Sequence, residues 1–154
     1  MDAFTFRELK NNPEQFFNLL PENWQVEIVP FWKTHKNSAK IYIIENHCTI
    51  IGGGIVFSKS PPQFEYFETE AKPYFDEGYL YLGFIWIAEH QRNKNLGTFW
   101  LNQLKSENPR QNYFLLTEED YLQHFYEKNG FSRIKLVQNQ DHMEWLYISK
   151  PDKG

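Results

Sequence analysis

The stretch that most constrains the fold is an apolar run near the middle of the chain. Residues 79–87 read Tyr-Leu-Tyr-Leu-Gly-Phe-Ile-Trp-Ile and contain no charged side chain. A continuous apolar run of this length is typical of a central strand that is covered on both faces of its sheet. A polar loop follows, and a helix is predicted from Asn95 to about Glu107, with an apolar side formed by Leu96, Phe99, Trp100, Leu101 and Leu104. The sequence therefore predicts a buried strand that turns within a few residues into an amphipathic helix.

The rest of the chain adds further strands and helices. Apolar and β-branched patterning predicts strands at Phe4–Leu9, Lys40–Glu45, Cys48–Phe57, Tyr113–Leu116, Phe131–Val137 and His142–Ile148. Helices are predicted from Asn12, between Pro21 and His35, and from Glu118 to Lys128, and Pro30 is expected to break the second. Residues 59–78 include Pro61, Pro62, Pro73 and Gly78 and are predicted to form a long connecting loop.

Length and composition fit one folded domain. The chain has 154 residues, of which 41% are apolar and 18% aromatic, so it can bury a sizeable core. The order of predicted elements is that of an α+β (α/β) protein. We expect residues 1–154 to form a single domain with a mixed, mostly antiparallel central sheet of about six to seven strands, flanked by about four helices.

Charge and cysteine content argue against several classes of protein. The net charge of −4 disfavours a broad phosphate-binding surface, so no nucleic-acid partner is expected. No stretch approaches the roughly 20 apolar residues of a membrane span. The first residues lack the basic and then apolar pattern of a secretion signal, and the single cysteine, Cys48, cannot form an internal disulfide. We therefore expect a cytoplasmic protein with no membrane partner, and predict no metal site.

The loop between the central strand and its helix has the properties of an anion site. A helix start presents unpaired N–H donors and a partial positive charge. Arg92 and Lys94 add charge, Gly97 removes a side chain where a phosphate would approach, and Thr98 can donate a hydroxyl. A solvated polar turn would have the same composition, so this loop alone leaves both interpretations open.

A second segment favours the anion site. Residues 125–131 read Phe-Tyr-Glu-Lys-Asn-Gly-Phe, and residues 92–97 read Arg-Asn-Lys-Asn-Leu-Gly. Together they resemble the GNAT superfamily of N-acetyltransferases, in which the acetyl-CoA loop reads Gln/Arg-x-x-Gly-x-Gly/Ala and a later helix ends in Leu-Tyr-Glu-Lys-x-Gly-Phe. Two positions depart from the family pattern: Asn95 replaces the first glycine of the loop, and Glu119 replaces an asparagine that usually holds the pantetheine arm. Asn tolerates the left-handed backbone better than other non-glycine residues, so the turn is expected to survive.

The resemblance implies a reaction and the residues that support it. In the family, an acetyl group passes directly from acetyl-CoA to an amine while both are bound. It implies that the Ile87 backbone and the position of Glu119 contact the pantetheine arm, and that Tyr126 protonates the leaving thiolate. It also implies a pyrophosphate site formed by Arg92 and by backbone N–H groups of the loop and helix start, namely those of Asn93, Lys94, Asn95, Leu96, Gly97 and Thr98.

The residue that accepts the amine proton is less clearly indicated. The glutamate that the family carries on its central strand falls near Tyr79 or Tyr81, so it is missing here. Glu89 is the candidate base, with Glu119 and Glu77 as alternatives, and each of the three could equally be a surface acid.

The acceptor is expected to be an amine of a small molecule or peptide. The segment 59–78 carries one lysine, Lys72, against five acids, which are Glu65, Glu68, Glu70, Asp76 and Glu77. Such a charge balance would favour a cationic amine or polyamine. A catalytically weak or inactive module with the same fold, which binds acyl-CoA or a protein, is the alternative function, and a homodimer is left open.

Overall fold

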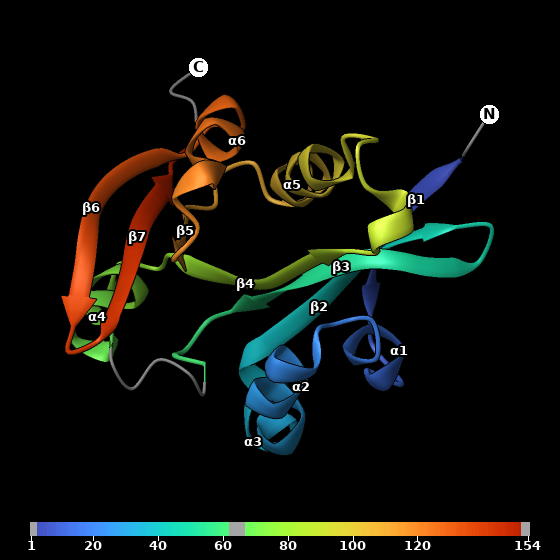
Figure 1. Cartoon of the computed structure of the whole chain (residues 1–154), viewed down its shortest axis with the longest axis horizontal. Coiled ribbons are helices and arrows are strands. Elements are labelled where there is room, and N and C mark those ends of the chain that lie inside the picture. Colours follow the sequence, from blue (N-terminus) through green and yellow to red (C-terminus); the bar gives the residue numbers. More distant parts are fainter. Residues whose placement is uncertain (1–2, 62–66, 152–154) are drawn as a thin grey trace.

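The computed structural model describes residues 3–61 and 67–151 of the chain. Its centre is one seven-stranded sheet in the order β1-β2-β3-β4-β5-β7-β6 (Figure 1). Neighbouring strands are antiparallel except for β4 and β5, which are parallel. The strands are β1 (Phe4–Leu9), β2 (Ala39–Asn46), β3 (Thr49–Phe57), β4 (Leu80–Ile87), β5 (Tyr113–Thr117), β6 (Ser132–Asn139) and β7 (His142–Ser149). The predicted mixed, mostly antiparallel sheet is confirmed.

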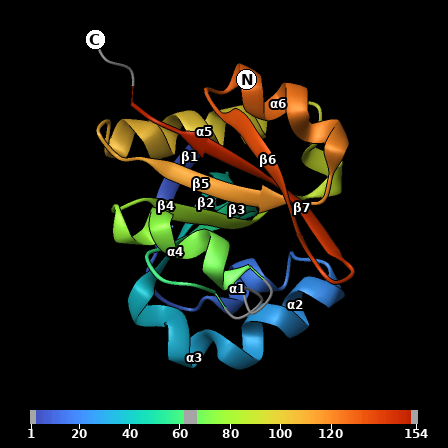
Figure 2. The same cartoon turned by 90° about the vertical axis from the view of Figure 1, so that its left-hand side faces the viewer.

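Helices cover both faces of the sheet. Helices α5 (Leu96–Glu107) and α6 (Gln123–Lys128) lie on one face, and the remaining helices lie on the other (Figures 1 and 2). These are α1 (Glu14–Phe17), α2 (Glu22–Ile28), α3 (Trp32–His35) and α4 (Glu68–Asp76). No helix in the described residues is long and apolar enough to cross a membrane.

The helices differ from the predicted ones at two places, the start of α6 and the segment that contains α4. The helical stretch between Pro21 and His35 is confirmed, and a 3-10 turn at Val29–Phe31 separates α2 from α3 because Pro30 has no N–H to donate. The helix predicted from Glu118 begins later: a 3-10 turn at Asp120–Leu122 leads into α6.

The prediction of a loop throughout residues 59–78 was wrong, because α4 forms within it around Pro73. Two aromatic side chains of α4 pack against Phe114 of β5: the ring centroid of Tyr74 lies 5.2 Å, and that of Phe75 5.0 Å, from the Phe114 centroid. Ala71 of the same helix is also buried. This tertiary packing outweighs the cost of a proline inside the helix. Glu65, one of the five acids noted above, lies outside the described residues.

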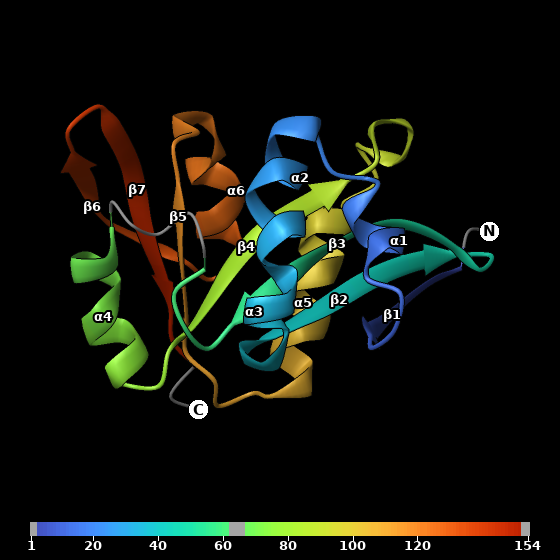
Figure 3. The same ribbon diagram turned by 90° about the horizontal axis from the view of Figure 1, so that it is seen from below.

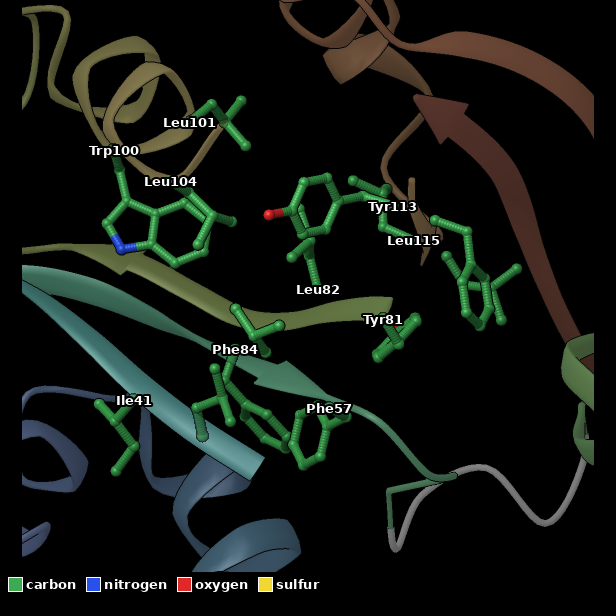
Figure 4. Packing of buried hydrophobic residues seen from close by; sticks show 14 of the residues in the cluster. Ile41, Phe57, Tyr81, Leu82, Phe84, Trp100, Leu101, Leu104, Tyr113 and Leu115 are labelled. Atoms are coloured by element: carbon green, nitrogen blue, oxygen red, sulfur yellow. The ribbon is translucent and has the colours of Figure 1, made fainter. Parts of the chain in front are cut away.

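Trp100 of α5 anchors the helix to the sheet. Its side chain is fully buried, and its indole Nε1 donates a hydrogen bond to the Tyr42 carbonyl of β2 at 3.0 Å. Figure 4 shows Trp100 above the strands, beside Leu104, while Phe57 and Phe84 lie on the opposite face. A Cβ atom at Gly54 of β3 would lie 2.7 Å from Cζ2 of Trp100, so the indole fits here because Gly54 has no side chain.

A bulge in β4 separates this strand from β5. The pairing of β3 with β4 shifts register between Gly53 and Ile55, and Phe84 adopts a left-handed backbone with φ 54°. On the other side, β4 pairs with β5 only through Leu80↔Tyr113 and Tyr81↔Phe114. The two strands then diverge (Figure 3). A gap therefore opens in the sheet between the carboxyl-terminal ends of β4 and β5.

The fit between Gly54 and Trp100 gives the first prediction. The substitution Gly54→Ala should destabilise the fold by about 1–3 kcal/mol, because the added methyl group must displace a fully buried indole. Urea unfolding would measure the loss. In a Trp100→Phe background the same substitution should cost less, since the smaller ring leaves room. Equal costs in the two backgrounds would show that the indole is not the source of the effect.

Candidate active site

The loop after β4 approaches the start of α5 through two left-handed residues. Asn93 has φ 66° and Asn95, the residue that precedes α5, has φ 59°. Both are asparagines, which tolerate this backbone region because their short polar side chains bond locally. The expectation that the turn survives without the family glycine is confirmed.

The amino-terminal end of α5 is open to an anion. No side chain caps this helix end, and its first turn contains no acidic residue. Helix starts usually receive one or the other, because the first N–H groups have no partner within the helix. Arg92 and Lys94, both exposed, add positive charge beside it. The residues present therefore fit the pyrophosphate of acetyl-CoA.

Arg92 also stabilises the carboxyl-terminal end of β4 through two contacts. Its Nε donates to the Ile87 carbonyl at 3.0 Å, and its guanidinium carbon lies 4.4 Å from the centroid of the Trp86 ring. Lys94 donates to the Gln91 side-chain oxygen at 2.9 Å. The phosphate contacts of the two cations and the pantetheine contact of Ile87 stay predictions.

The two motifs recognised in the sequence contact one another. A Cβ atom at Gly97 would lie 2.8 Å from Cζ of Phe125, so this glycine allows α5 and α6 to pack closely. The buried Asn129 side chain donates both to the Thr98 hydroxyl at 3.2 Å and to the Phe125 carbonyl at 2.8 Å. Packing between the helices is therefore a role of Gly97 and Thr98 that the sequence analysis did not anticipate.

Tyr126 is buried where α6 packs against β7. Its ring contacts those of Phe131 and Tyr147, with centroid distances of 5.7 and 5.1 Å. Burial raises the pKa of its phenol, with the nearby phenols of Tyr147 and Tyr121 acting in the same direction. Tyr126 donates no hydrogen bond to any described residue. It thus holds a proton at neutral pH, as the acid role requires.

The other predicted site residues lie at the surface. Glu89 is exposed in a 3-10 turn at Glu89–Gln91, beyond the end of β4. The Glu119 backbone N–H donates to the Thr117 hydroxyl at 3.1 Å, and the residue is exposed. Their roles at the amine and at the pantetheine arm stay predictions.

The sequence analysis missed three carboxylates around the gap. Glu144 of β7 is partly buried, and desolvation raises its pKa to about 7, with the charges of Glu118 and Glu27 adding to the shift. Desolvation and Glu118 also raise the pKa of Glu27 on α2. Residues 117 and 145 form the last pair between β5 and β7, so Glu118 stands at the next position, opposite Glu144. Like charges at such positions repel and favour the protonated acid.

Among the described residues, no group of three or more acids, histidines or cysteines could hold a metal ion.

The phenol of Tyr81 on β4 interacts electrostatically with Glu144 and Glu27 and also with Tyr126. It occupies the region where the sequence analysis expected the family glutamate, and its side chain is buried. Burial raises the pKa of its phenol well above the usual range, and the charges of Glu144, Tyr126 and Glu27 act in the same direction. A hydrogen bond with the backbone of Leu116 opposes the shift. A tyrosine here cannot replace a glutamate as a base at neutral pH.

One signal in the sequence could have indicated Glu144. It stands between Met143 and Trp145 in a strand that is otherwise largely apolar. An acid at such a position is either exposed on the outer face or buried at a functional site. Only the tertiary structure distinguishes these cases.

The raised pKa of Glu144 predicts how stability depends on pH. The folded protein binds this proton more tightly than the unfolded chain, so the free energy of unfolding falls as pH rises from about 4.5 to about 7. The variant Glu144→Gln removes the cost of ionising this desolvated carboxyl group, so it should be more stable than the parent at pH 8, but not below pH 4.5. The gain in the free energy of unfolding at pH 8 is at most about 3 kcal/mol, and partial exposure of the side chain reduces it to about 1–2 kcal/mol. Urea unfolding at both pH values would test this, with the exposed Glu14→Gln as control; a gain independent of pH would contradict it.

The backbone of Asn95 gives a further prediction. Asn95→Ala should destabilise the fold by about 1–2 kcal/mol, because alanine resists the left-handed region. Asn95→Gly should carry no such cost. Thermal unfolding of both variants would test the explanation, and an equal loss in the two would mean that the asparagine side chain matters instead.

Comparisons with known proteins agree with this geometry. Residues 6–131 match the family model described as Acetyltransferase (GNAT) family. An aminoglycoside 6'-N-acetyltransferase complexed with coenzyme A shares the fold with a TM-score of 0.68 at 15% identity, covering 95% of this chain and 96% of that one. A GNAT family acetyltransferase from Elizabethkingia anophelis with acetyl-CoA bound has a TM-score of 0.64 at 16% identity, covering 97% and 99%. No curated protein sequence gives a significant match. The family model covers well over half of the chain, which therefore belongs to the GNAT family of acetyltransferases.

Proposed function

We propose that this chain acts as a single acyltransferase domain that moves an acetyl group from acetyl-CoA to an amine nitrogen of a small molecule or peptide. One observation supports the proposal: the uncapped start of α5 packs, through Gly97 and Phe125, against α6, the helix that carries the buried phenol of Tyr126. Acetyl transfer from acetyl-CoA requires a site that binds the pyrophosphate and a donor that protonates the leaving thiolate.

Acetyl-CoA, the co-substrate of the family, supplies a thioester whose carbonyl carbon accepts the amine. We assign its pyrophosphate to the N–H groups from Asn93 to Thr98, with charge from Arg92 and Lys94. The pantetheine arm is assigned to the edge of β4 near Ile87 and to the neighbourhood of Glu119. The unpaired edge of β4 beyond Tyr81 supports this assignment, because it offers backbone groups that β5 does not use.

Tyr126 is proposed to deliver a proton to the sulfur as the carbon–sulfur bond breaks. Its raised pKa supports the role of donor, since the phenol keeps its proton throughout the neutral range. Burial also shields the site from water that would hydrolyse the thioester.

An acceptor amine with positive charge is favoured by the acids near the gap. The charges of Glu118 and Glu27 add to the desolvation that raises the pKa of Glu144, and Glu118 adds to the desolvation that raises the pKa of Glu27. Part of the charge on α4 is already paired, because Lys72 bonds to Asp76 and Lys135 to Glu70, each at 2.8 Å. The proposed acceptor site therefore depends less on the segment 59–78 than on these three acids. A cytoplasmic location, the absence of a nucleic-acid partner and the homodimer stay predictions.

Acetyl-CoA binding can be tested by thermal unfolding. At about 100 times its dissociation constant the ligand should add roughly 2.7 kcal/mol, or several degrees in melting temperature. Arg92→Glu/Lys94→Glu should lose this shift, because both replacements repel the pyrophosphate. Lys10→Glu/Lys33→Glu makes the same charge change at exposed positions and should keep it. A parent protein that shows no shift would refute acetyl-CoA binding.

Catalysis is tested separately. Tyr126→Phe should lower kcat about 100-fold or more and leave acetyl-CoA binding almost unchanged, since only the transferred proton is removed. Tyr121→Phe makes the same chemical change at an exposed tyrosine and should keep activity. The measurement is turnover on a panel of polyamines, aminoglycosides and peptides. A protein that binds acetyl-CoA but acetylates none of them would favour the alternative of an inactive binding module.

A further inference from the structure

We propose that Glu144 is the general base that takes the proton from the acceptor amine, and that Glu118 and Glu27 tune it. This inference rests on the proposed function. It names the group that replaces the family glutamate absent from β4.

The position of Glu144 on β7 follows from the alternation of side chains along a strand. Tyr147 contacts Tyr126, so its side chain points to the face of α6. Glu144 is three positions earlier and therefore points to the opposite face, toward α2 and α4. Figure 2 shows α6 on one side of β7 and α2 on the other. Acid and base thus approach the same gap from opposite faces of the sheet.

This arrangement suits a direct transfer. One face of the gap carries the start of α5 and Tyr126, where the thiolate would leave. The other face carries Glu144, where an amine would enter. A base on the acceptor side and an acid on the thiol side do not exchange protons with each other directly, so each acts on its own partner.

The surroundings of Glu144 on that face are mostly negative or neutral. Glu27 comes from α2, Glu118 follows β5, and the phenol of Tyr81 comes from β4. Lys135 of β6 lies on this side of the hairpin, but it bonds to Glu70 of α4 at 2.8 Å. His142 of β7 contacts the ring of Phe67. An approaching ammonium would meet an excess of negative charge, and a carboxylate held among other carboxylates is more basic than one in water.

The acceptor ammonium loses two protons during the reaction, as its nitrogen bonds to the thioester carbon and the carbon–sulfur bond breaks. Glu144 takes the first and releases it to solvent. The Tyr126 phenol gives its proton to the sulfur, and the second proton of the nitrogen replaces it by way of solvent. The net products are the amide, the free thiol and one proton.

Glu89, the base predicted from the sequence, lacks this setting. It lies in the turn after β4 and is exposed. Glu144, by contrast, is partly buried and stands within a strand of the sheet. The two candidates can be compared directly by mutation.

The experiment is the pH dependence of kcat on whichever amine the parent acetylates. The parent should show an acid limb with a midpoint near pH 7, because the base must be ionised. Glu144→Gln should lower kcat about 100-fold or more and abolish the limb, while acetyl-CoA binding stays intact. Glu118→Gln should move the midpoint of the limb to lower pH, since it removes a charge that repels the ionised Glu144 carboxylate. A residue with a purely structural role would not produce that displacement.

Controls separate the alternatives. Glu14→Gln changes an exposed acid on α1 and should leave the profile unaltered. His142→Gln should keep the limb, which excludes an imidazole as its source. Carbon-detected NMR of the Glu144 carboxyl group gives a readout without turnover: it should titrate near pH 7, and at lower pH in Glu118→Gln.

Specific results would overturn the inference. They are full activity in Glu144→Gln, loss of the limb in Glu89→Gln with retention in Glu144→Gln, or a Glu144 carboxyl group that titrates like a solvated glutamate. Failure of the proposed function would appear differently, because the parent itself would then bind no acetyl-CoA or acetylate no amine.

Discussion

The separation of β4 from β5 is the constraint on which the rest of the structure depends. A bulge at Phe84 turns the second half of β4 away, and the two strands stay paired at only two positions. The cost of a left-handed phenylalanine is offset by aromatic packing, since its ring lies 6.0 Å from that of Trp24 and 6.3 Å from that of Phe57. Beyond Tyr81, the edge of β4 that faces β5 therefore keeps backbone groups that β5 does not pair.

Residues of the two sequence motifs stabilise the fold, besides the binding and catalytic roles proposed for them. Gly97 and Asn129 bring α5 against α6, and Arg92 holds the end of β4. Rigid packing of this kind keeps the open helix start and Tyr126 at a constant separation, which a transfer reaction needs. Mutations in the motifs will therefore often affect stability and binding together.

Burial raises the pKa of two side chains, the phenol of Tyr126 and the carboxyl group of Glu144. It keeps the phenol of Tyr126 protonated, and it raises the pKa of Glu144 to about 7. A base that titrates near the working pH is ionised often enough to act and basic enough to accept a proton. Desolvation thus shifts both groups toward their protonated forms.

The sequence by itself determined the succession of strands along the chain, the turn from a buried strand into α5, and the family. These are local properties, because apolar periodicity, caps and short motifs act over a few residues. Tertiary structure alone decided the helix at α4, where packing on Phe114 overcomes Pro73. It also decided which acids face the gap. Glu27, Glu118 and Glu144 lie on three separate segments, and a carboxylate gains basicity only when a fold brings it near others and away from water.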